Sequence, residues 1–153
     1  ADERHMQEVP VSKEWENYGG EWAGADGEAV FRRWIDIPAH WAGKDLLLSL
    51  GAVDDFDMTF FDGHPVGATD VQVPNFWSVQ RLYTVPGKWV TPGRHVIAVR
   101  VFDHFGGGGM VGQPDQLTLA PKEALVRPLP PLYHPDWRDD FPLGDDPYRY
   151  YRW

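Results

Sequence analysis

Short apolar runs broken by glycine, proline and aspartate recur along this chain. The strongest spans residues 94–102, where β-branched residues supply packing surface and His95 and Arg100 interrupt them. Residues 29–37 form a second run, in which Phe31, Ile35 and Ile37 fall on one face of an extended strand. Side chains alternate between the two faces of a strand, so both runs are predicted to be β-strands.

The remaining apolar runs predict further strands. Asp62-Gly63 is a dipeptide typical of a type I′ hairpin turn, and it separates two of these runs. We expect strands at residues 45–50, 58–61, 64–68, 78–85 and 110–119. Three loops lie between them, a corner at 51–57, a long loop at 69–77 and a glycine-rich loop at 103–109. No run has the period and caps of a long helix, so helix should be scarce.

The ends of the chain have a different character. Residues 1–28 are polar and interrupted, and are predicted to form a lead-in strand and loop. Residues 121–153 contain seven of the 14 prolines and close on an aromatic stretch, which predicts an extended segment packed on the domain or on a neighbour. The β-sandwich itself is therefore assigned to residues 29–120.

Composition supports an all-β fold and restricts the partners. The chain of 153 residues contains 8 Trp, 8 Phe and 6 Tyr beside 16 Gly and 14 Pro, a composition typical of a β-sandwich. Its formal net charge of −9 argues against binding to nucleic acid or to an anionic membrane, which need basic surface. With no cysteine, disulfides and thiol chemistry are excluded. No apolar run is long enough for a membrane-spanning helix or a signal peptide.

Four segments in order carry a family resemblance. They are FRRWIDIP (31–38), HWAGKDLLLSLGAVDD (40–55), FFDGHPVG (60–67) and VTPGRHVIAVRVFD (90–103). Together, over residues 28–120, they resemble the sugar-binding jelly-roll domain of glycoside hydrolase family 2 and the equivalent domain of sialate O-acetylesterase-like proteins. The resemblance implies a galactose-binding-like sandwich of two antiparallel sheets, secreted or periplasmic, beside a separate catalytic domain.

Catalysis within the chain itself is not expected. Ser12, Ser49 and Ser78 lie in no nucleophile elbow, and Ser49 is expected to be packed within its strand. Corner acids Asp54, Asp55 and Asp57, with Asp103, are expected to form turns, with binding of ligand hydroxyls or calcium as the second possibility and a catalytic carboxylate pair as the third. The six histidines lack zinc-ligand spacing.

The candidate ligand site combines aromatic rings with hydrogen-bonding groups, as sugar recognition requires. We expect the three loops to converge on one edge of the sandwich and to supply Asp54, Asp55, Phe56, Asn75, Trp77, Asp103, His104 and Phe105. Trp77 is either a ligand platform or a core residue. The four glycines at 106–109, the glycine run, are either a flexible connection that crosses between the sheets or a wall against which a ligand or a neighbouring domain lies. Phe31, Trp34, Phe60 and Phe102 are expected in the core, with Trp41 and Trp89 over its ends.

Three functions remain open from the sequence. The first is a non-catalytic carbohydrate-binding module of a polysaccharide-processing enzyme, with a neutral sugar as ligand unless Arg33, Arg81 or Arg100 form a basic patch. The second is a structural accessory domain, and the third a small enzyme that uses the acidic corner. No cofactor is required, although calcium, with Asp26, Glu28 and Asp115 as candidate ligands, fits an acidic β-sandwich.

Overall fold

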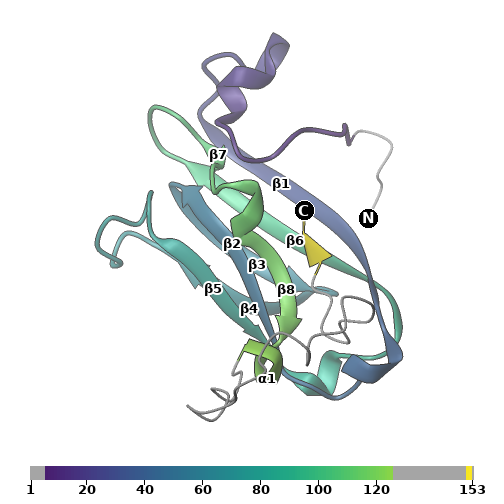
Figure 1. Cartoon of the computed structure of the whole chain (residues 1–153). Helices are drawn as coiled ribbons and strands as arrows, with labels where there is room; N and C mark the ends of the chain where they lie inside the picture. Colours follow the sequence, from purple (N-terminus) through teal and green to yellow (C-terminus); the bar gives the residue numbers. More distant parts are fainter. Residues whose placement is uncertain (1–5, 126–150, 153) are drawn as a thin grey trace, which may run out of the picture.

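Two antiparallel sheets face each other in the computed structural model, which describes residues 6–125 and the backbone of residues 151 and 152 (Figure 1). The first sheet has the order β1-β6-β3-β4, and the second the order β5-β2-β8-β9, with β7 paired to the end of β2. The first sheet comprises β1 (Gly27–Ile37), β6 (Gly93–Asp103), β3 (Phe56–Phe61) and β4 (His64–Thr69). The second comprises β5 (Gln80–Val85), β2 (Leu46–Asp54), β8 (Leu117–Pro121), β7 (Gly109–Met110) and β9 (Tyr151–Arg152). The predicted all-β sandwich is therefore confirmed.

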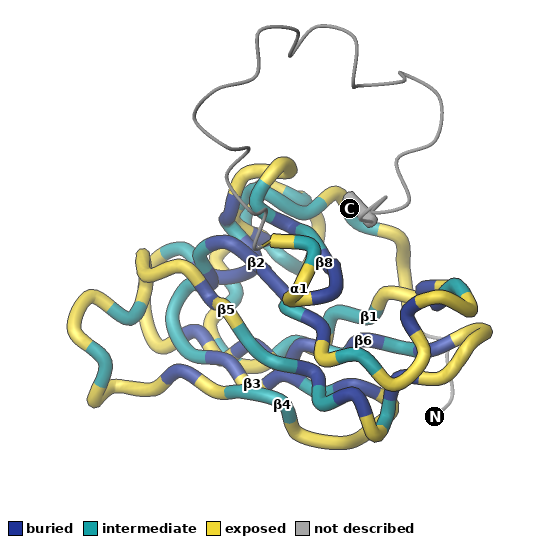
Figure 2. Tube along the Cα trace, turned by 60° about the horizontal axis from the view of Figure 1, so that its bottom comes forward, coloured by how far each residue is buried: buried dark blue, intermediate teal, exposed yellow. Residues whose placement is uncertain are grey.

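The core lies between the sheets and follows the predicted alternation. Along β6, Ile97, Val99 and Val101 are buried, whereas the residues between them are half-buried or exposed. The continuous apolar run of β2 is explained by its central position between β5 and β8, where residues of both parities are buried. Figure 2 shows buried segments in both layers and exposed loops around the rim.

The lead-in, as far as it is described, is in a strand only at Gly27 and Glu28, the first residues of β1, and has no strand of its own. It forms the 3₁₀ turns η1 (Trp15–Tyr18) and η2 (Gly20–Trp22) instead. Trp15 is only 1% exposed, and its ring lies against Gly108, where a Cβ atom would come within 2.6 Å of the ring. The main-chain N–H of Trp15 donates to the carbonyl of Gly108 (2.8 Å). Part of the glycine run is therefore a wall, against which the chain's own lead-in packs.

Two strand boundaries differ from the prediction. The expected corner at 51–57 is much tighter, because β2 continues to Asp54 and β3 begins at Phe56. The single last strand expected at 110–119 is divided into β7 and β8 by the 3₁₀ turn η5 (Pro114–Gln116). The Asp62-Gly63 turn is confirmed, with φ of 47° and 80°, as a type I′ turn requires.

The remaining elements lie at the ends of the sandwich. The 3₁₀ turns η3 (Ala39–Trp41) and η4 (Gly87–Trp89) and the single-turn helix α1 (Lys122–Leu125) connect strands. In the described part of the chain no helix could cross a membrane. Tyr151 and Arg152 pair with β8, whereas the rest of the predicted extended C-terminal segment, residues 126–150 and 153, lies outside the described residues.

Candidate functional site

The three predicted loops meet at one edge of the sandwich. The carboxylate Oδ2 of Asp55 accepts a hydrogen bond from the main-chain N–H of His104 (3.0 Å), which joins the corner to the glycine loop. The ring of Phe56 lies 4.7 Å from that of Phe76. This contact joins the corner to the loop of residues 70–79 between β4 and β5, which was predicted at 69–77. In Figure 1 the glycine loop and the 70–79 loop project on the same side of the sandwich, with the end of β2 between them.

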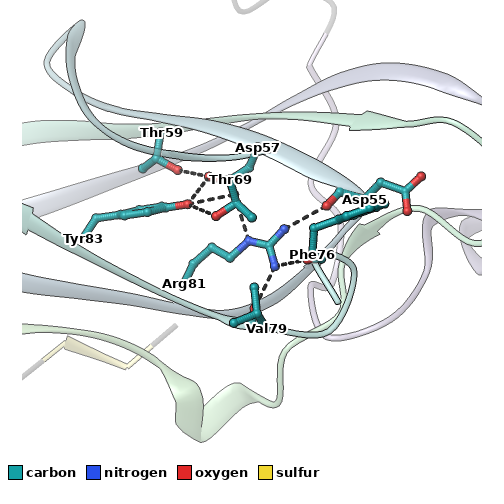
Figure 3. Close-up of polar contacts among 8 residues, drawn as sticks. All are labelled: Asp55, Asp57, Thr59, Thr69, Phe76, Val79, Arg81 and Tyr83. Carbon is teal, nitrogen blue, oxygen red and sulfur yellow. Dashed lines mark hydrogen bonds and ion pairs between the residues drawn. The ribbon is translucent and has the colours of Figure 1, made fainter. Parts of the chain in front are cut away.

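A buried arginine holds two of these segments together (Figure 3). Arg81, on β5, donates from its NH1 group to the carbonyls of Phe76 and Val79, and from NH2 to the carbonyl of Asp55 (2.9 Å). Its Nε donates to Oδ1 of Asp57 (2.9 Å), and both side chains are completely buried. Arg81 therefore fixes the 70–79 loop against the corner through main-chain oxygens.

The charge of Arg81 is balanced inside the fold. Oδ2 of Asp57 accepts the hydroxyl of Thr59 (2.8 Å), and the phenol of Tyr83 also donates to this carboxylate (2.9 Å to Oδ1). Burial, followed by the charge of Asp57, raises the pKa of Tyr83 well above its ordinary value, so the phenol remains a donor. The network is a closed structural unit, so Asp57 is a packing residue and Arg81 contributes to no surface basic patch.

The acids of the corner repel one another electrostatically. Burial, a hydrogen bond with Asp55 and the charges of Asp55, Asp103 and Glu14 raise the pKa of Asp54 to about 7. Burial also raises the pKa of Asp103, and the charge of Asp55 adds to this increase, although the bond from the N–H of Phe105 opposes it. The edge is therefore strongly acidic.

Aromatic rings form a row beside these acids. Phe102 and Phe56 stack with centroids 6.2 Å apart, and Phe76 and Trp77 follow, 5.1 Å apart and nearly perpendicular. Trp77 is 47% exposed and Phe105 is 84% exposed. The alternative of Trp77 as a core residue is excluded, because nearly half of its surface is exposed.

The other predicted positions are placed as follows. Asn75 is exposed in the 70–79 loop with a φ of 55°, and its main-chain carbonyl accepts the N–H groups of Ser78 and Val79. His104 is exposed and meets Asp55 through its main chain. Ser49 is buried and hydrogen-bonded to the carbonyl of Gln116, in agreement with a packed role.

Two of the predicted core aromatics are not in the core. Trp34 and Phe102 are 45% and 44% exposed, because they lie on the outer face of the first sheet. Phe31 and Phe60 are half-buried, and Phe31 packs against the core. Trp41 is completely buried, whereas Trp89 packs partly buried against the core.

The organising role of Arg81 was not predicted from the sequence. The alternation in β5 could have indicated it, because Arg81 and Tyr83 point to the same face of the strand as the buried Val85. Leu82, on the other face, is 52% exposed. An arginine on the inner face needs a buried partner, because an unpaired buried charge is costly. The acids of the lead-in, Glu14 and Glu16, were missed because nothing in their spacing links them to the corner.

The described residues do not form the predicted calcium site. Among residues 6–125, no group of three or more histidines or acids is arranged to hold a metal ion. One candidate ligand, Glu28, pairs with Arg100 (2.6 Å) on the surface. The residues present do not fit a calcium site.

Comparison with solved structures identifies the class of fold. The chain superposes on part of a GH2 β-galacturonidase from Eisenbergiella tayi with a TM-score of 0.54 and 22% identity, over 67% of this chain and 18% of that one. It superposes on part of the Ruminococcus gnavus β-glucuronidase with a TM-score of 0.54 and 14% identity, over 64% and 16% of the two chains. No family model and no curated protein matches the chain.

The fold is thus a β-sandwich that also occurs within GH2 enzymes, and the predicted resemblance is confirmed at the level of fold. The matches cover less than a fifth of each of these enzymes.

Proposed function

We propose that this β-sandwich is a non-catalytic carbohydrate-binding module of a secreted or periplasmic glycan-processing enzyme. The observation that carries the proposal is the exposed aromatic row ending at Trp77, fixed beside hydrogen-bonding side chains by the Arg81 network. A pyranose presents a C–H face to an aromatic ring and hydroxyls to carboxylates, so the edge offers both kinds of contact.

The occurrence of the fold within GH2 enzymes supports an accessory role. The shared part is a small fraction of those chains, and chemistry is not a property of a fold. Binding would raise the local concentration of a linked catalytic domain on its glycan. An exposed edge with few desolvated contacts corresponds to a modest affinity, with a Kd of roughly 10 μM to 1 mM.

Retardation of the protein in native gels cast with neutral, acidic and basic polysaccharides tests the proposal. The module is expected to migrate more slowly in the presence of at least one glycan, without releasing reducing ends or acetate. Release of either product, lost on Asp54→Asn or Asp55→Asn, would instead support an enzyme. A folded protein that no glycan retards would contradict the binding-module function.

A purely structural accessory domain is the second candidate, and an exposed apolar face that shares Phe102 with the aromatic row favours it. The outer face of the first sheet exposes large apolar side chains, each between 42% and 45% exposed: Val30, Trp34, Met58 and Phe102. Exposed apolar surface of this kind often contacts another protein domain. Absence of retardation across the panel would make this the leading function.

A further inference from the structure

Six carboxylates surround the edge where the corner and the glycine loop meet. Besides Asp54, Asp55 and Asp103 they include three acids of the lead-in, Glu14, Glu16 and Asp26, whose charges act on Asp54 or Asp103. Glu14 lies directly over the glycine loop, since a Cβ atom on Gly107 would come within 2.5 Å of its carboxyl carbon. Glu16 accepts the N–H of Gly108 (3.2 Å). The acids therefore form one cluster.

No cation of the described residues offsets the carboxylate charges that act on Asp54 and Asp103. Arg81 contacts the main-chain oxygen of Asp55, but its charge is paired with Asp57. Figure 3 shows the carboxylate of Asp55 pointing away from the guanidinium, which reaches only the main-chain oxygen of Asp55. The ion pairs of residues 6–125 lie elsewhere, for example between Lys44 and Glu123 and between Arg100 and Glu28.

The hydrogen bonding of Asp103 gives a second observation at the same edge. Asp103 is 1% exposed, and its Oδ2 has no hydrogen-bond partner, although Oδ1 accepts the N–H of Phe105 (3.0 Å). Oε1 of Glu16 is buried without a partner as well. Buried carboxylate oxygens are normally satisfied, so this part of the cluster lacks hydrogen-bond donors.

The aromatic row adjoins this acidic cluster. Asp55 precedes Phe56 in the chain, and its carboxylate binds the N–H of His104, next to the exposed Phe105. Ammonium groups are attracted both by carboxylates, through charge-assisted hydrogen bonds, and by the faces of aromatic rings. Uronate groups, such as the galacturonate bound by the Eisenbergiella tayi enzyme, would be repelled by the same carboxylates.

We propose that the glycan bound at this edge carries protonated amino groups, as an oligosaccharide of glucosamine does. This inference rests on the proposed carbohydrate-binding function and names its ligand class. The ring of the sugar stacks on Trp77 or Phe105, and its ammonium group donates to the carboxylate of Asp55. The charge of the ligand, rather than its hydroxyl pattern, then provides most of the selectivity.

The test compares two ligands with the same backbone and different charge. Calorimetry is done with chitosan oligomers and with fully N-acetylated chitin oligomers of equal length, at a pH where the free amine is protonated. We expect the chitosan oligomer to bind at least about tenfold more tightly, and this advantage to shrink as ionic strength rises. A uronate oligomer should not bind measurably.

Two charge variants locate the effect. Asp55→Asn keeps an oxygen that can accept the N–H of His104, but removes one charge from the cluster, so it should reduce the preference for chitosan several-fold. Asp115→Asn removes one charge from an exposed residue outside the cluster and should leave the preference unchanged.

Each result has a distinct meaning. Equal binding of both oligomers, or preference for the acetylated one, would overturn the amino-sugar inference while leaving the carbohydrate-binding function intact. A preference that survives Asp55→Asn as well as Asp115→Asn would also overturn it, because net charge alone would explain the binding. Failure of every glycan in the panel to bind would overturn both proposals.

Discussion

Arg81 and Asp57 form an ion pair in which Nε and Oδ1 are 2.9 Å apart and both side chains are completely buried. The remaining donors of the guanidinium hold the carbonyls of Phe76, Val79 and Asp55. One side chain from β5 thus stabilises the interior and fixes the loop that presents Trp77.

Replacing this arginine should strongly destabilise the fold. Arg81→Met leaves the carboxylate of Asp57 buried without its cation, and we expect the free energy of unfolding to fall by about 3–5 kcal/mol. Denaturant unfolding followed by tryptophan fluorescence measures the change. Arg100→Met is the matched control, since the Arg100–Glu28 pair is exposed and should contribute little. Similar losses in the two variants would contradict a central role for Arg81.

The lead-in segment should be an integral part of the folding unit. Trp15 is buried, its main chain binds Gly108, and its Nε1 donates to the carbonyl of Ala25 (2.8 Å). Trp15→Ala should therefore cost about 3–5 kcal/mol of unfolding free energy, as expected for a large buried aromatic residue. Trp34→Ala, at an exposed tryptophan of β1, serves as the comparison and should cost much less. If Trp15→Ala were no more harmful than Trp34→Ala, the lead-in would not belong to the core.

Asp54 should make stability depend on pH. Its pKa is raised from an ordinary value of 3.8 to about 7, so the native state binds this proton more tightly than the unfolded chain. The resulting stabilisation is fully present below pH 4 and is lost as the pH rises to about 7. Asp54→Asn, which resembles the protonated acid, should raise the melting temperature more at pH 8 than at pH 5. An equal change at both values would exclude a raised pKa.

Much of the fold could be predicted because the chain alternates regularly. The hairpin at Asp62-Gly63 and the central strand of the second sheet follow from turn chemistry and from an apolar run. By the same alternation, Trp34 and Ile35 point to opposite faces of β1, and Ile35 is the buried one. Trp34 was expected in the core only because its ring is large, and that expectation was wrong. Ring size alone does not decide which face a residue occupies.

The candidate site was only partly predictable. The convergence of the corner, the 70–79 loop and the glycine loop followed from the resemblance to a known topology. The contribution of Glu14 and Glu16 depends on how the lead-in packs over Gly107 and Gly108, a contact between distant parts of the chain that no local pattern encodes.

The most direct measurement is glycan retardation of Trp77→Ala beside Trp34→Ala and the unmodified protein, with folding checked by circular dichroism. Trp77 ends the aromatic row at the proposed site, whereas Trp34 is equally exposed on the outer face of the first sheet. We expect Trp77→Ala to lose retardation while Trp34→Ala keeps it. Full retardation of a folded Trp77→Ala variant, or loss in Trp34→Ala alone, would show that glycan binds elsewhere and would contradict the proposed site.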